Sequence, residues 1–321
     1  MNFTRLFTAA SMACALIMSA QAQTYPTKPI QFVVPYTPGT TADVLARLLS
    51  AKISQRWNVP VLVENKTGAS GIIGTAAVAK AAPDGYTFLF AATSYSTVAA
   101  INPKLPYDSV KSFAPVSLLG TSSMTLVVTN EFPAKTVKEF VAYVKKNPGQ
   151  IDYASPGAGS SQHLSMELFK QESKTDMQHV PYKGTSGVMN DIMAGHVKAS
   201  VVALQSATPF VQSGSVRMLA IMSRKRAPTF PDVPTMLELG YPTMLVDTWY
   251  GVMAPAGTPP ALIDKLNAEI NSLLQLPEIK EAMAKQGVEP AGGSPKVLDT
   301  LVKFQHKLWT QVVARGKIVA E

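Results

Sequence analysis

The chain has 321 residues, 46% of them hydrophobic, and this length and composition suffice for two globular domains with their own cores. Its formal net charge is +8, but apart from Arg224-Lys225-Arg226 the basic residues are scattered. They form no stripe with interleaved aromatic residues, so the charge pattern excludes a nucleic-acid-binding surface.

The N-terminus predicts an export signal. Arg5 supplies a positive charge, an apolar run follows, and Ala20-Gln21-Ala22 fits the small-x-small cleavage rule. We therefore expect residues 1–22 to be removed, Gln23 to begin the mature chain, and the protein to act in the periplasm. The only cysteine, Cys14, lies in this segment, which excludes disulfides, zinc–thiolate sites and cysteine catalysis in the mature chain.

Short apolar segments alternate with segments of helical periodicity in the first third of the chain. This order is typical of βα units in a mostly parallel sheet that is covered on both faces. The expected strands are residues 30–35, 59–64 and 86–92, and the expected helices are residues 42–55 and an alanine-rich helix opened by residues 68–74.

A second run of βα units follows from about residue 113. The expected strands are residues 114–121, 124–129, 151–155, 178–182, 199–204 and 218–223, and the expected helices are residues 136–146, 161–171, 188–194 and one that begins at 209–213. Residues 226–242 are rich in proline and lack periodicity, so they predict a connecting loop. A strand at 249–254 and helices at 260–274, 277–285 and 295–314 complete the chain.

This order predicts an α/β protein whose first domain is interrupted by a second. We expect the first domain to comprise residues 23–122 and 245–321, and the second to comprise residues 123–244. Two chain crossings between domains form a hinge, and ligands of such folds bind in the cleft between the domains.

Loops rich in glycine and hydroxyl residues follow several predicted strands. Residues 36–41 (YTPGTT), 155–161 (SPGAGSS) and 184–186 (GTS) each precede a helix. Such loops offer unpaired backbone N–H groups, the positive end of a helix dipole and hydroxyl donors, which favour carboxylates and phosphates. A serine or threonine before a helix can also be a simple N-cap, so these loops indicate a site only if they meet across the hinge.

Other chemistries find little support in the sequence. Residues 68–74 (GASGIIG) have GxxGxxG spacing and no following P-loop lysine, so they favour close helix–sheet packing over nucleotide binding. The four histidines lack metal-ligand spacing, and neither a metal nor a cofactor is expected. His163 follows Ser160 and Ser161 and could serve a serine nucleophile, which keeps a hydrolase open as the weaker alternative, although no acid partner can be named.

Eight segments resemble the Bug-type solute-binding proteins of tripartite tricarboxylate transporters, over essentially the whole mature chain. These segments are residues 25–30 (YPTKPI), 35–43, 65–74, 83–87 (PDGYT), 153–164 (YASPGAGSSQHL), 179–184 (HVPYKG), 249–251 and 254–259. The resemblance implies a two-domain, type II-like Venus-flytrap periplasmic binding fold with the ligand cleft between the domains. It also implies a monomer that binds a small organic carboxylate for membrane transporter subunits and catalyses no reaction.

The same resemblance implies a set of ligand-binding residues. They are Tyr36, Thr37, Gly39, Thr40, Thr41, Thr93 and Ser94 in the first domain, and Ser155, Gly157, Gly159, Ser160, Ser161 and Thr185 in the second. The family often carries an Asp at about Val202, where it would pair with the ammonium of an amino acid. Its absence favours an apolar or aromatic carboxylate, including a dicarboxylate. A periplasmic sensor subunit that docks onto a signalling receptor remains an alternative function.

Overall fold

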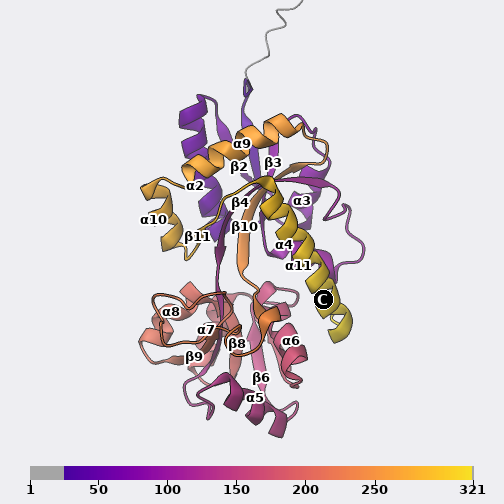
Figure 1. The fold of residues 1–321 in the computed structure, drawn as a ribbon. Helices are drawn as coiled ribbons and strands as arrows, with labels where there is room; N and C mark the ends of the chain where they lie inside the picture. Colours follow the sequence, from indigo (N-terminus) through magenta and orange to yellow (C-terminus); the bar gives the residue numbers. More distant parts are fainter. Residues whose placement is uncertain (1–24, 320–321) are drawn as a thin grey trace, which may run out of the picture.

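The computed structural model describes residues 25–319, and the predicted export signal lies outside this range. The described chain forms two α/β domains, one above the other in Figure 1, and each is built around its own β-sheet. Among residues 25–319, none of the helices combines the length and the apolar composition that crossing a bilayer requires. The two-domain fold predicted from the sequence is confirmed.

The first domain contains a six-stranded sheet in the order β11-β4-β10-β3-β1-β2. Its strands are β1 (Ile30–Val34), β2 (Val61–Asn65), β3 (Thr87–Ala92), β4 (Phe113–Ser122), β10 (Thr248–Pro255) and β11 (Glu289–Pro290). The helices of this domain are α2 (Thr41–Trp57), the 3-10 turn η1 (Ala69–Gly71), α3 (Ile72–Ala79), α4 (Ser94–Ile101), α9 (Pro260–Leu273) and α10 (Pro277–Lys285).

Helices cover both faces of this sheet, which explains why Phe32, Val33 and Val34 of β1 are apolar in succession. Phe32 packs in one hydrophobic cluster with Leu45 of α2 and with residues of α9. Val33 points the other way, into a cluster with Val78 of α3 and Leu89 of β3. Where helices cover both faces of a strand, successive residues such as Phe32 and Val33 are both buried, so the sequence of the strand need not alternate.

The second domain contains a five-stranded sheet in the order β7-β6-β8-β5-β9. Its strands are β5 (Met124–Thr129), β6 (Asp152–Ser155), β7 (Gln178–Pro181), β8 (Ala199–Ala203) and β9 (Val216–Ile221). Its helices are α5 (Val137–Lys146), α6 (Ser161–Ser173), α7 (Thr185–Met193) and α8 (Leu204–Gln212), and the 3-10 turn η2 (Pro242–Met244) lies on the return to the first domain.

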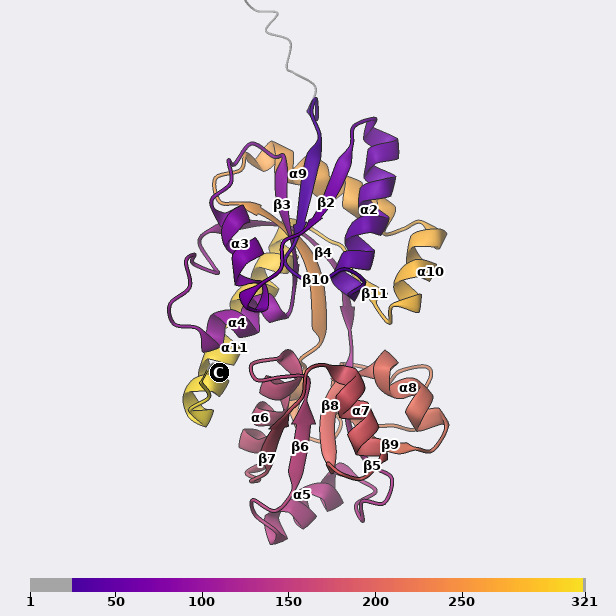
Figure 2. The same cartoon turned by 180° about the vertical axis from the view of Figure 1, so that it is seen from behind.

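Both sheets are mixed: β1 to β4 share one direction in the first domain and β6 to β9 share one in the second, as expected of βα units, and β10, β11 and β5 oppose them. β10 is antiparallel to β3 and β4, and β5 is antiparallel to β8 and β9. The cause lies in the crossings between the domains. Strands of βα units run toward the junction of the domains, whereas β5 and β10 start at that junction and run away from it (Figure 2).

Two helices also differ from the prediction. α4 was not predicted because its sequence, SYSTVAAI, is rich in serine and β-branched residues, yet packing against the C-terminal helix α11 (Pro295–Gly316) supports it. α8 begins at Leu204, five residues earlier than expected, and contains Pro209. Tertiary packing therefore overrides local propensity in both segments.

The helix α11 belongs to both domains in its packing. Its N-terminal half contributes Leu298 and Val302 to a first-domain cluster, whereas Trp309 and Val312 lie in the core of the second domain. Gln305, between them, is buried, and its Oε1 accepts hydrogen bonds from the indoles of Trp249 (2.8 Å) and Trp309 (3.4 Å). Figure 1 shows α11 extending from the first domain down beside the second.

Candidate ligand-binding cleft

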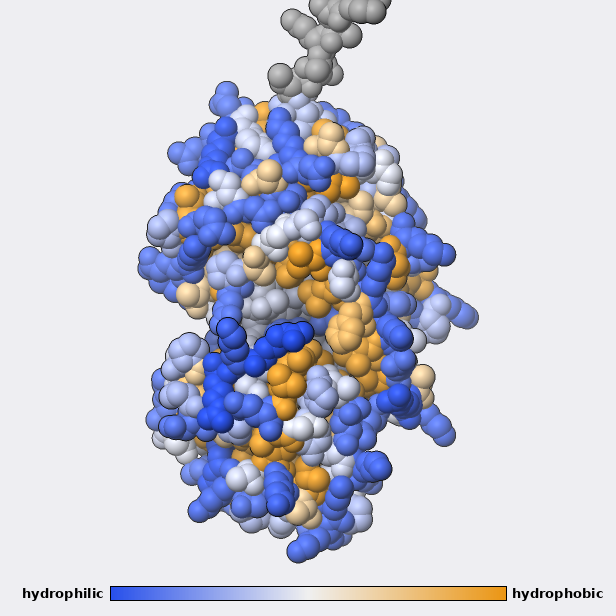
Figure 3. Space-filling view, viewed as in Figure 1, coloured by the Kyte–Doolittle hydropathy of each residue, from blue (hydrophilic) through white to orange (hydrophobic). Residues whose placement is uncertain are grey.

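Loops of both domains enclose a cavity of about 460 Å³ at the junction of the two domains. It is lined in the first domain by Pro35, Tyr36, Thr37, Thr40, Thr67, Gly68, Ser70, Gly71, Ser94, Val98 and Ile101, and in the second by Pro156, Gly157, Ala158, Gly159 and Ser160. The space-filling view in Figure 3 shows how the surface narrows between the two domains. None of the lining residues carries a charged side chain.

A buried carboxylate holds the first-domain loop between β1 and α2. Asp43 Oδ2 accepts a hydrogen bond from the backbone N–H of Gly39 (2.9 Å), and Oδ1 accepts one from Asn65 (2.8 Å) and lies 3.0 Å from the Arg47 guanidinium. Burial opposes the charge of Asp43, but these hydrogen bonds together hold its pKa below the ordinary value. The loop is therefore anchored by a group that stays ionised at neutral pH.

The N-terminus of α2 beside this loop carries no side-chain cap. The Thr40 hydroxyl donates to the carbonyl of Thr37 (2.9 Å) instead of accepting from the first turn, and the first helical hydrogen bond runs from Val44 N to Thr40 O. Within the described chain, the N–H groups of Thr41 and Ala42 have no hydrogen-bond partner. An uncapped helix N-terminus of this kind favours an anion.

Tyr36 presents a hydroxyl donor at the cavity. Its oxygen accepts hydrogen bonds from the backbone N–H of Ala92 and from the Ser94 hydroxyl, both at 3.0 Å. Burial raises the pKa of Tyr36 to about 12, so the phenol keeps its proton. Neither hydrogen bond uses that proton, which leaves it for a ligand.

The second-domain loop, residues 155–161 between β6 and α6, is held by its own side chains. Gly157 N donates to Ser155 Oγ (3.2 Å), Gly159 N donates to His163 Nδ1 (3.0 Å), and His163 N donates to the Ser160 hydroxyl, which thereby caps α6. Gly157 and Gly159 adopt φ values of +146° and +72°, which favour glycine.

The N–H groups at the tip of this loop remain available. In the described residues, no hydrogen bond engages the backbone N–H of Ala158, Ser161 or Gln162. The N-terminus of α6 thus offers unpaired donors, as does that of α2. The junction of the domains therefore brings together the ends of two helices, which is the condition under which these loops indicate a site.

Seven of the thirteen predicted site residues line the cavity and six do not. Those at the cavity are Tyr36, Thr37, Thr40, Ser94, Gly157, Gly159 and Ser160, and those away from its wall are Gly39, Thr41, Thr93, Ser155, Ser161 and Thr185.

Four of the five hydroxyls away from the cavity wall have hydrogen-bond partners within the protein. Thr93 is buried and accepts from the backbone N–H of Trp249 (2.7 Å), because it joins β3 to β10. Ser155 is buried beneath its loop, and Ser161 donates to Gln162 Oε1 (3.0 Å). Thr41 donates to Gln286 Oε1 (3.3 Å). Gly39 is an exposed turn residue, and Thr185 begins α7.

Residues 67–71 form a part of the cavity that was not predicted from the sequence. The glycines of residues 68–74 were interpreted as helix–sheet packing, which does describe Gly74, since a Cβ there would overlap the carbonyl oxygen of Lys66. Thr67 and Ser70, however, are exposed and line the cavity. The available signal was the position of these hydroxyl residues just after β2, at the same edge of the sheet as the β1–α2 loop.

Three other interpretations of the sequence concern residues that the structure describes. Ser161 donates to Gln162 and His163 Nδ1 accepts from Gly159, so these residues do not form a serine–histidine pair. Within residues 25–319 no group of three or more His, Cys, Asp or Glu residues could hold a metal ion. Val202 is buried in a hydrophobic cluster with Ala154 and Val188 and does not line the cavity.

Comparisons with known proteins agree on one family. Residues 45–317 match the model of the tripartite tricarboxylate transporter family receptor. The protein BugT of Bordetella pertussis is 36% identical over 318 residues, which cover 98% of each chain.

Solved structures point in the same direction. An R. palustris protein solved with adipate is 32% identical, with a TM-score of 0.77 over 92% of this chain and 99% of its own. MatC of Rhodopseudomonas palustris, solved with bound malate, is 32% identical, with a TM-score of 0.74 over 90% of this chain and all of its own.

Proposed function

This chain belongs to the tripartite tricarboxylate transporter receptor family, and we propose that it captures a small organic carboxylate between its two domains for a membrane transporter. One observation carries the proposal: the loops that precede α2 and α6 line one cavity, where the N–H of Ala158 is unpaired, and the unpaired N–H groups in the first turns of both helices lie next to its wall. Helix N-termini bind carboxylates through such groups. The relatives solved with adipate and malate support the same ligand class.

The cavity wall favours a carboxylate with an apolar body. Hydroxyls of Tyr36, Thr37 and Ser70 alternate with apolar surface from Val98 and Ile101. No acidic side chain is present on the wall to pair with a ligand ammonium, which argues against an amino acid. The ligand we propose is therefore an apolar or aromatic mono- or dicarboxylate, and the protein acts as a carrier without catalytic chemistry.

Carboxylate binding should be visible as stabilisation of the folded protein. A thermal-shift screen over mono-, di- and tricarboxylates, with adipate and malate as first probes, is expected to give at least one ligand that raises the melting temperature. At a ligand concentration about 100 times Kd the gain is about 2.7 kcal/mol, because the ligand binds only the folded state. The proposal fails if no carboxylate stabilises the protein or is detected by calorimetric titration.

Variants of the two loops then locate the site with the ligand that the screen identifies. Thr40→Val is expected to weaken binding about 10-fold or more, because the Thr40 hydroxyl, which donates to the Thr37 carbonyl in the free protein, would turn its proton to the ligand carboxylate. Little stability should be lost, because Thr40 does not cap α2. Ser160→Ala should weaken binding and also cost about 1 kcal/mol of stability, because Ser160 caps α6. Thr136→Ala removes the equivalent cap of α5, far from the cavity, and should affect stability alone. Normal binding by both loop variants would place the ligand elsewhere.

We further propose that the protein acts in the periplasm after loss of residues 1–22. The motivation is the basic start, the apolar run and Ala20-Gln21-Ala22. The intact mass of protein isolated from the periplasm should correspond to a chain that begins at Gln23. A mass that includes Met1 would contradict the cleavage.

A further inference from the structure

Two histidine rings stack against each other directly beneath the second-domain loop. His163 in the first turn of α6 and His179 on β7 lie with ring centroids 3.8 Å apart and planes within 6°. The ring of Tyr153, on β6, stacks on His179 with centroids 5.0 Å apart. His163 and Tyr153 are buried, so this stack forms the floor of the loop.

Each histidine is connected to one of the two glycines that shape the loop. His163 Nδ1 accepts the N–H of Gly159 (3.0 Å), which requires this ring nitrogen to carry no proton. His179 Nε2 is hydrogen bonded to Ser155 Oγ (2.7 Å), and this same hydroxyl contacts both the N–H (3.2 Å) and the C=O (3.0 Å) of Gly157. The loop conformation thus depends on hydrogen bonds made by both rings.

The surroundings of the pair favour the uncharged state of His163. Burial is the main cause that lowers its pKa to about 4, and His179 and Lys170 act in the same direction. Glu167 opposes this effect, but its carboxylate is already engaged by Lys170 (2.7 Å) and by the hydroxyl of Tyr153. A proton on either stacked ring would also repel a proton on the other.

We propose that His163 and His179 are positioning residues of the ligand site, which hold the second-domain loop in its binding conformation, and that His163 does so only while its ring is uncharged. A proton on His163 Nδ1 would face the N–H of Gly159, donor against donor, and release that hydrogen bond. Gly159 also packs against Ile101 of the first domain, where a Cβ would overlap Ile101 Cδ1. Gly159 and Ile101 both line the cavity, so displacement of Gly159 would change the cavity wall in both domains. This inference rests on the carboxylate-binding function proposed above.

Two substitutions at His163 separate hydrogen bonding from packing. Asparagine in His163→Asn offers an oxygen near the position of Nδ1, so it can accept from Gly159 but cannot titrate. Phenylalanine in His163→Phe keeps a flat ring on His179 but has no acceptor. The first readout needs no ligand: amide hydrogen exchange of Gly159, measured by NMR on the mature chain and expressed as a protection factor.

The expected exchange results differ for the three proteins. In the wild type, Gly159 should be protected at neutral pH and lose this protection as the pH falls to about 4. His163→Asn should keep the protection at both pH values, and His163→Phe should lack it at both. Equal protection in all three proteins, or the same pH profile in wild type and His163→Asn, would overturn the inference.

Nitrogen chemical shifts of the wild-type ring give a measurement that depends on no variant. At neutral pH, His163 should carry its proton on Nε2, with Nδ1 unprotonated. A protonated Nδ1 at neutral pH is incompatible with the hydrogen bond to Gly159 and would overturn the inference even if both variants failed to fold.

Calorimetric titration with adipate completes the test. We expect wild-type affinity to fall about 2-fold further than that of His163→Asn between neutral pH and about pH 4, where about half of His163 is protonated, and about 10-fold further at about pH 3. Protonation of adipate itself affects both proteins alike, so the difference between them reports the histidines. If the wild type binds neither adipate nor any other carboxylate at neutral pH, the proposed function fails, whereas the exchange experiment still decides whether the pair positions the loop.

Discussion

Replacement of Asp247 by asparagine is expected to raise the free energy of unfolding by about 4 kcal/mol at pH 8 and by much less at pH 5. The pKa of Asp247 is raised from 3.8 to about 7 in the folded protein. A carboxyl group with a raised pKa contributes its full stability below its unfolded pKa and loses it as the pH rises through the folded pKa. Asparagine resembles the protonated form at every pH, so the variant avoids that loss.

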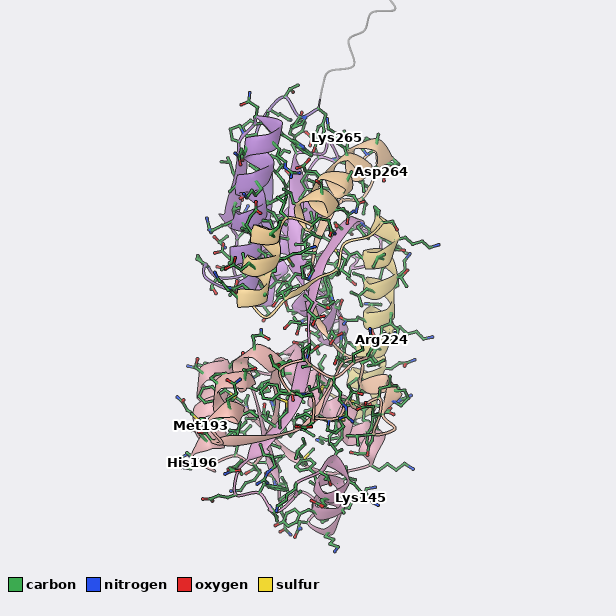
Figure 4. The ribbon with its side chains drawn as sticks, turned by 60° about the vertical axis from the view of Figure 1, so that its left-hand side comes forward. Lys145, Met193, His196, Arg224, Asp264 and Lys265 are labelled. Carbon is green, nitrogen blue, oxygen red and sulfur yellow. The ribbon has the colours of Figure 1, made fainter. Side chains whose placement is uncertain are left out.

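The position of Asp247 explains this shift. Asp247 precedes β10, where the chain returns from the second domain to the first. Burial is the main cause of its raised pKa, and the charge of Glu289 raises the pKa further. A hydrogen bond from Ser123 and the charge of Arg224 lower it. Within the described chain, its buried Oδ1 has no hydrogen-bond partner. Figure 4 shows Arg224 at the level where the two domains meet.

Urea titrations at both pH values measure the effect of Asp247→Asn. The matched control is Asp264→Asn on α9, an exposed position at the outer part of the first domain in Figure 4, where a change within about 0.5 kcal/mol is expected. A variant that is no more stable than the wild type at pH 8, or that shows the wild-type dependence on pH, would contradict the assignment of a buried, largely uncompensated carboxyl.

Truncation of Trp309 to alanine is expected to cost about 3–5 kcal/mol of stability. The indole is fully buried in the core of the second domain, although it is carried by a helix that begins in the first. Its loss removes this core contact and one of the two indoles that donate to Gln305. Chemical denaturation followed by circular dichroism measures the change.

Phe304→Ala on the same helix is the control for Trp309→Ala. Phe304 is 53% exposed, so its truncation should change the stability by no more than about 0.5 kcal/mol. If both substitutions lowered the free energy of unfolding equally, the packing of Trp309 in the second-domain core would not be what stabilises α11.

The family and the two-domain fold were predictable from the sequence because both depend on local patterns, namely short motifs, apolar segments and helical periodicity. The apolar run of β1 and the helical spacing of α2 survive in the structure with ends shifted by only a few residues. The mixed direction of the sheets was not predictable in this way. It follows from the two crossings, and residues near Ser123 carry no local sign of which way the next strand runs.

In the candidate site, the sequence likewise does not determine which partner each hydroxyl group binds. The sequence places Thr40 and Ser160 in equivalent positions before a helix, yet only Ser160 caps its helix, whereas Thr40 donates to Thr37. Thr93 ends β3 in the sequence pattern, but its partner is the backbone of Trp249, more than 150 residues away. Partners so distant in the chain are set by the tertiary fold, and the residues at the cavity remain a prediction until binding is measured.

Because α11 packs in the cores of both domains, the order in which the chain is synthesised matters for its folding. The first domain lacks β10 until residue 255 has been made, and the core of the second domain lacks Trp309 and Val312 until residue 312 has left the ribosome. Neither domain is therefore complete in a nascent chain that still misses its C-terminal helix. A protein organised in this way completes the packing of both domains only after α11 has been made.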